Sequence, residues 1–116
     1  MANKEAVKML KGQKVAAFNK WVKQRRKKGK NALDLDDQNL SGLKLRHVDL
    51  RNAHLNGTNL RKTDLKGANL KGARLRQADL RGANLKGADL TGADLRRAQH
   101  KGVDFSRAIL QDARGI

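Results

Sequence analysis

Leucine recurs at every fifth position of this chain from Leu40 to Leu110, apart from His100 and Phe105, and a small residue stands two positions before most of these leucines. An α-helix turns about 100° per residue, so a five-residue spacing scatters the leucines around it. A flat strand sends successive leucines to opposite faces, because its side chains alternate with period two. The leucines therefore share one core only if the chain bends once in every unit.

Each unit reads as inward, outward, inward and then two corner residues. In Ala83-Asn84-Leu85-Lys86-Gly87, Ala and Leu face inward, Asn faces outward, and Gly suits a tight turn because it tolerates positive φ. Four such corners make a square coil of about twenty residues, and coils stack at roughly 4.8 Å. The pattern predicts an all-β solenoid of about four coils with a core of Leu and Ala. Its central leucines are Leu70, Leu75, Leu80 and Leu85.

The units Ala68-Asn69-Leu70, Ala78-Asp79-Leu80 and Ala88-Asp89-Leu90 resemble the pentapeptide repeat family, whose motif is A(D/N)LXX. The resemblance extends over about residues 33–116 and implies a right-handed quadrilateral β-helix. Some members of that family resemble duplex DNA and protect DNA gyrase by mimicry, which requires a negative surface. The opposite charge of this chain argues against that role.

Residues 3–28 break the five-residue pattern and read as two helices, about 3–11 and 14–28, separated near Gly12. Asn3 is the expected N-cap of the first helix. Phe18 and Trp21 lie on the apolar face of the second helix, where we expect them to plug the first coil. Base stacking on nucleic acid is the alternative for these two rings. We therefore expect a helical cap with a basic run in residues 1–30 and a repeat β-helix in residues 31–116.

The chain carries a formal net charge of +16, and residues 1–32 hold 11 Lys/Arg against one acid, Glu5. Such a charge attracts polyanions over about a Debye length but does not identify them. The basic run near the end of the second helix has two interpretations: a solvated helix end, or a patch for nucleic acid, an anionic membrane or targeting. Its members are Lys23, Arg25, Arg26, Lys27, Lys28 and Lys30.

Placing four units on each coil arranges the outward residues in four columns and predicts three basic sides and one balanced side. The balanced side is centred on Leu50, Leu70 and Leu90, where Arg51 and Lys71 face several Asp residues. Lys or Arg on the basic sides either keep the turns soluble or form ladders for phosphate groups. Together with the basic run, the candidate polyanion-binding residues are Arg61, Lys62, Arg74, Arg76, Arg81, Arg96, Arg97 and Lys101.

Catalysis is not expected, because no nucleophile stands beside a base and the carboxylates recur as repeat elements. No metal-ligand spacing, phosphate loop or cysteine is present, so no cofactor or metal is expected. No apolar run is long enough to span a membrane and no secretory signal is visible, so a cytoplasmic location is the default. His100 takes an inward position near the open end of the stack. Ile109 and Ile116 there leave a homodimer through the C-terminal coil open.

Two functions follow from the sequence. The first is a non-catalytic repeat binding module that engages a polyanion such as nucleic acid through its basic faces. The alternative is a structural or protein-interaction scaffold, natural or designed, whose charge serves only solubility. Salt-dependent binding to nucleic acid distinguishes the two.

Overall fold

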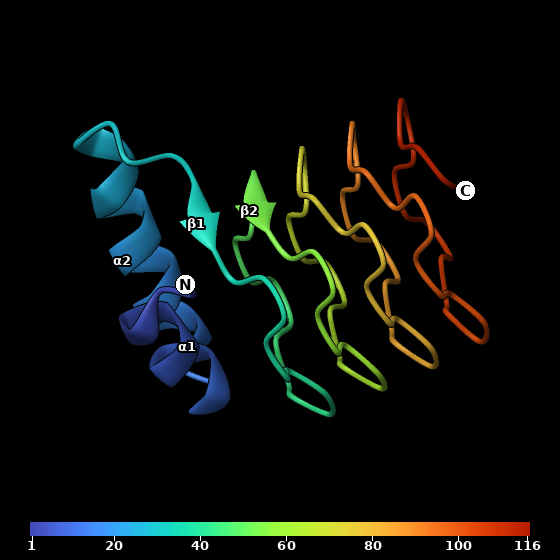
Figure 1. Cartoon of the computed structure of the whole chain (residues 1–116), viewed down its shortest axis with the longest axis horizontal. Coiled ribbons are helices and arrows are strands. Elements are labelled where there is room, and N and C mark those ends of the chain that lie inside the picture. Colours follow the sequence, from blue (N-terminus) through green and yellow to red (C-terminus); the bar gives the residue numbers. More distant parts are fainter.

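The computed structural model describes residues 1–116. Two helices, α1 (Lys4–Lys11) and α2 (Val15–Lys27), precede two short parallel strands, β1 (Leu33–Asp34) and β2 (Ala53–His54). The helices lie at one end of a row of coils that advances to the C-terminus at the other end (Figure 1).

Both helices begin and end within one residue of the ranges expected from the sequence. Asn3 has extended backbone angles and its side-chain oxygen accepts a hydrogen bond from the Ala6 N–H at 3.1 Å, so it is the N-cap of α1. Gly12 is the C-cap that ends α1 and separates it from α2.

Parallel bridges join residues twenty positions apart along the stack. Asn39 pairs with Asn59, and Asn59 in turn pairs with Asp79. In the same column the Leu40 N–H donates to the Asn59 carbonyl at 2.8 Å. A register of twenty residues places four pentads on each coil, which makes the coil quadrilateral. Each side is named here after one central leucine: the Leu75 side (Leu35, Leu55, Leu75, Leu95), the Leu80 side (Leu40, Leu60, Leu80), the Leu65 side (Leu45, Leu65, Leu85) and the Leu70 side (Leu50, Leu70, Leu90, Leu110).

The corners have positive φ two residues after the leucine, whether or not glycine stands there. The φ angle is 66° at Gly67 and 60° at Gln77. The N–H of the next residue closes the corner, as where Ala68 donates to the Leu65 carbonyl at 2.9 Å. Glycine is frequent at these positions because a side chain disfavours this conformation.

The core is one continuous column of leucine and small side chains. Leu70, Leu75, Leu80 and Leu85 are all fully buried, as the five-residue spacing requires. Two threonines replace alanine in the core, at positions 58 and 63, and each hydroxyl donates to a leucine carbonyl at 2.7–2.8 Å. These hydrogen bonds allow a polar group to be buried without a large free-energy cost.

The helices continue this core at its N-terminal end. Phe18 is fully buried in it, together with Leu10 of α1. Trp21 is only half-buried, and the Arg25 guanidinium lies over its ring at 4.9 Å from the centroid. Phe18 thus lies inside the core cluster, whereas Trp21 packs against it and is only partly enclosed.

The opposite end of the core is less covered. His100 is exposed and its ring packs edge-on against Phe105, with the ring centroids 6.1 Å apart. Ile109 and Ile116 are 49% and 54% exposed.

Candidate polyanion-binding surface

The outward Asp and Asn residues close the turns of the solenoid. Asp79 accepts a hydrogen bond from the backbone N–H two residues later, that of Arg81, at 3.2 Å. Asn59 and Asp94 accept equivalent bonds from the residues two positions after them, both at 3.1 Å. This Asx-turn contact explains why the unit prefers Asp or Asn between Ala and Leu. The carboxylates thus have a role in the fold.

Several of these carboxylates also bind arginine side chains. Burial alone would raise the pKa of Asp49, but hydrogen bonds from Arg26 and Arg51 outweigh it and lower the pKa to about 2. Hydrogen bonds from Arg96 lower the pKa of Asp94, also to about 2. These acids are ionised at neutral pH and offset the charge of their partners. The arginine–aspartate pairs are Arg26–Asp49, Arg46–Asp64, Arg51–Asp49, Arg61–Asp79, Arg81–Asp79 and Arg96–Asp94.

Most of the positive charge has no such partner. Six of the 27 Lys/Arg side chains lie within 4.0 Å of a carboxylate, which leaves 21 unpaired. Of the candidate residues on the solenoid, Arg61, Arg81 and Arg96 are paired. Lys62, Arg74, Arg76, Arg97 and Lys101 are unpaired.

The basic run at the end of α2 divides in the same way. Arg26 makes two hydrogen bonds to Asp49, at 2.6 and 2.8 Å, and so ties α2 to the solenoid. Arg25 lies over Trp21 and donates to the Ala32 carbonyl at 3.3 Å. The four lysines of the run, Lys23, Lys27, Lys28 and Lys30, are exposed and unpaired.

The Leu80 side carries less uncompensated charge than its sequence indicated. Arg61 and Arg81 stack in one column and share Asp79, at 3.9 and 2.7 Å. The like-charge ladder expected from the sequence is therefore broken by this carboxylate, and Lys62 and Lys101 remain as its unpaired cations.

The Leu75 side is not uniformly basic, and the prediction of a basic side is wrong for its first coil. That coil carries three acids, whereas the coils nearer the C-terminus carry five arginines. This first coil contains Leu35, which precedes the regular leucine run that begins at Leu40. From the helices outward, the side presents Asp34, Asp36 and Asp37, then His54 and Asn56, then Arg74 and Arg76, then Asp94, Arg96 and Arg97, and finally Arg114.

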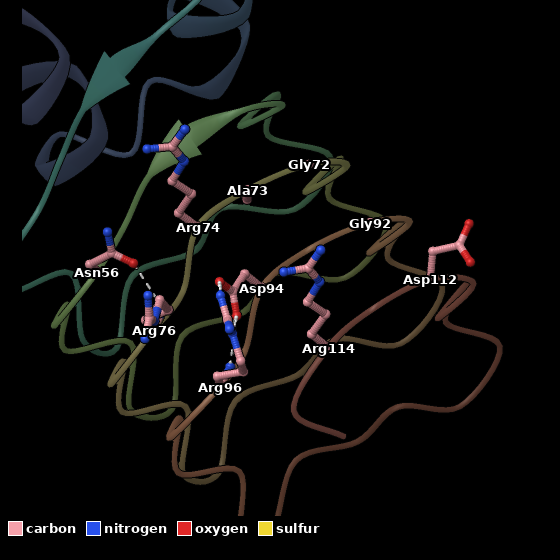
Figure 2. Close-up of a pocket in the computed structure, with 10 residues that line it drawn as sticks. All are labelled: Asn56, Gly72, Ala73, Arg74, Arg76, Gly92, Asp94, Arg96, Asp112 and Arg114. Atoms are coloured by element: carbon pink, nitrogen blue, oxygen red, sulfur yellow. Dashed lines mark hydrogen bonds and ion pairs between the residues drawn. The ribbon is translucent and has the colours of Figure 1, made fainter.

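A groove of about 540 Å³ crosses the basic half of this side (Figure 2). Its lining includes Gly72 and Gly92, which present no side chain at the corner. The Arg114 guanidinium points toward Asp94, whereas the Asp112 carboxylate points away from the arginines (Figure 2). The lining arginines are Arg74, Arg76, Arg96 and Arg114. Arg114 was not among the residues expected from the sequence, although its register twenty residues after Asp94 was a usable signal.

A regular four-sided coil, a leucine core and turn-closing acids define a pentad-repeat solenoid. The family model for pentapeptide repeats matches eight copies, over residues 39–77 and 73–112. The chain belongs to the pentapeptide repeat family, whose fold is the right-handed quadrilateral β-helix.

Three solved structures are similar to this chain to different degrees. A pentapeptide repeat protein, Rfr23, from the cyanobacterium Cyanothece 51142 is 41% identical with a TM-score of 0.66, over 71% of this chain and 54% of that one. The pentapeptide repeat protein alr5209 from Nostoc PCC 7120 is 36% identical with a TM-score of 0.46, over 72% of each chain. QnrB1, a plasmid-mediated fluoroquinolone resistance protein, is 21% identical with a TM-score of 0.56, over 64% of this chain and 37% of that one, and is alike in fold alone. The chain thus spans about half the length of Rfr23.

No curated protein matches the sequence. Neither helix has the length and apolar character needed to cross a membrane.

Proposed function

We propose that this protein is a non-catalytic repeat module that binds a polyanion, such as nucleic acid, through its basic surfaces. The observation that carries the proposal is the set of 21 Lys/Arg side chains without a carboxylate within 4.0 Å. With 11 acids against 27 Lys/Arg the chain keeps a net charge of +16, so the acids do not neutralise this excess. A rigid framework that holds many free cations outward attracts phosphate chains and releases their counter-ions on binding.

The proposal assigns different roles to two segments of the chain. Residues 1–30 act as a helical cap with a basic run, and residues 31–116 form a β-helix of about four coils. Burial of Phe18 against the first coil and the Arg26–Asp49 pair support the cap. A cap of this kind covers the core and the free sheet edge, which otherwise pairs with other chains.

A protein-interaction scaffold is the second candidate, and the exposed end of the solenoid favours it. Ile109 and Ile116 are about half exposed there, beside the partly buried Phe105 and Leu110. This apolar end suits contact with a protein, including a second copy of the chain. A molar mass from light scattering that corresponds to a dimer, and falls to a monomer in Ile109→Asp, is the result expected of this candidate.

Binding measured at two salt concentrations tests the proposed function. A labelled 20-mer duplex and a 20-mer single strand are each titrated with the protein at about 50 and 200 mM salt. The proposal predicts binding to at least one of them at low salt, weakened by at least about tenfold at the higher concentration. No binding of either at 50 mM salt refutes it and leaves the scaffold.

A further inference from the structure

We infer that the basic half of the Leu75 side is a discrete site for a short, flexible chain of two or three phosphate groups. The inference rests on the proposed polyanion binding and deepens it by naming the residues and the ligand. Its central members are Arg74, Arg76 and Arg114, which line one groove and have no carboxylate partner.

The ion pairs leave a defined charge in this groove. Arg96 binds Asp94 through its Nε and Nη2 atoms, at 2.9 and 2.8 Å, so this pair is neutral. The four arginines and two aspartates of the lining leave two net positive charges. An adjoining depression of about 260 Å³, lined in part by Arg76 and Arg97, supplies a third. Two to three phosphodiester charges neutralise the groove.

Arginine is suited to this task because its planar guanidinium binds phosphate oxygens in pairs. The groove is also open to a ligand backbone, since Gly72 and Gly92 place no side chain at its corner. No aromatic ring lies in the lining, so it offers no aromatic platform for bases and favours recognition of the phosphate groups.

Arg74 departs from the repeat in a way that the fold does not need. Its position normally holds the Asp or Asn whose side chain closes the turn, as Asp94 does one coil further on. At Arg74 that acceptor is missing, and Asn56 of the preceding coil replaces it by accepting from the Arg76 N–H at 3.0 Å (Figure 2). A turn closed from the neighbouring coil frees position 74 for an outward guanidinium.

The acidic first coil limits the length of the ligand. Asp36 lies two coils before Arg76 in the same column, a distance of about 10 Å at the usual strand spacing. Asp37 is exposed in the adjacent corner. A stiff duplex laid along this side carries phosphates past the arginines and onto these acids. In a single strand longer than about three phosphates the next phosphates meet the same acids, which limits the segment that the groove binds.

Anisotropy titrations with single-stranded dT4 and dT12 at 50 mM salt test the site. The variant Arg74→Asn/Arg76→Gln/Arg114→Gln is compared with Lys44→Gln/Lys66→Gln/Lys86→Gln, which removes the same charge from the Leu65 side. We expect the arginine variant to weaken dT4 binding about tenfold or more and the lysine variant to weaken it less than about threefold. Equal losses in the two variants overturn the discrete site while the general polyanion binding stands. No binding of either oligonucleotide or of the 20-mers overturns both.

Two further arms test the ligand and its length limit. Asp36→Asn/Asp37→Asn keeps the side-chain oxygens and is expected to strengthen dT12 binding about threefold, with dT4 unchanged. Unchanged dT12 binding overturns the limit set by the first coil. Inorganic tripolyphosphate offers the same phosphate groups without a nucleoside. If the arginine variant loses more affinity for tripolyphosphate than for dT4, the ligand of the groove is free polyphosphate and not nucleic acid. An acidic peptide that binds as tightly as dT4, with the same loss in the arginine variant, overturns the choice of phosphate.

Discussion

Replacing Asp49 by Asn removes the carboxylate that ties α2 to the solenoid. Asp49 and Arg26 are 19% and 18% exposed, and the Asp49 N–H is also held by the Asn19 side chain at 2.8 Å. The pKa of Asp49 falls from 3.8 to about 2 in the folded protein. At about 1.4 kcal/mol for each pKa unit, the ionised carboxylate stabilises the fold by about 2 kcal/mol.

The sign of this effect sets its pH window. Because the folded pKa is the lower one, the unfolded chain binds more protons between pH 4 and 2. The stabilisation is complete above pH 4 and is lost as the pH falls toward 2. Asp49→Asn is therefore expected to lower the free energy of unfolding by about 2 kcal/mol at pH 6 and by close to zero at pH 2.

Urea unfolding at constant ionic strength measures the difference at both pH values. Asp112→Asn removes the same charge from an exposed side chain that makes no ion pair or hydrogen bond, so it reports the general effect of losing an acid. A loss in Asp49→Asn that is the same at pH 2 and pH 6, or no larger than that of Asp112→Asn at pH 6, refutes the role of the pair.

Four further substitutions test the fold and the groove separately. Arg74→Asn restores the side-chain acceptor of its turn, so thermal unfolding is expected to show stability unchanged or raised by up to about 1 kcal/mol while dT4 binding weakens; a clear loss of stability contradicts this. Leu75→Ala, at a fully buried position, is expected to lower the free energy of unfolding in urea by about 3 kcal/mol. Leu110→Ala, at a half-buried position, is expected to lower it by about 1 kcal/mol. Equal losses contradict a core that is less covered at the C-terminal coil. Gln77→Gly removes a side chain from a corner with a φ of 60° and is expected to raise the melting temperature by relieving about 1 kcal/mol of strain; a lower melting temperature contradicts the corner geometry.

The fold was predictable because one spacing determines it. A five-residue period allows a common core only with a bend in each unit, and it places Leu70 and Leu75 inside whatever the outward residues are. The turn-closing bonds of Asp79 and Asn59 were not foreseen, although they explain the preference for Asp or Asn in each unit. Such bonds depend on side-chain direction at the corner, which spacing alone does not give.

The candidate surface was predictable only in part, because charge counting ignores pairing. Whether an arginine meets an aspartate depends on its rotamer and register: Arg81 binds Asp79 of its own unit, whereas Arg46 binds Asp64 of the next coil. The acids of the first coil escaped notice because that coil lies outside the leucine run that begins at Leu40. Extending the twenty-residue register back from Leu40 places Asp36 in the same column as Arg76, two coils nearer the helices. This arrangement, and not the net charge, indicates a basic groove that ends at the acids of the first coil.

Arginine side-chain signals in ¹H–¹⁵N NMR spectra test the central claim most directly. The Nε–H resonances are followed while dT4 is added at 50 mM salt. Binding in the groove predicts saturable shifts at Arg74, Arg76 and Arg114, with Arg46 and Arg51, which are already paired with aspartates, nearly unchanged. Shifts of similar size at all of these arginines, or none at the first three while dT4 is bound, contradict it.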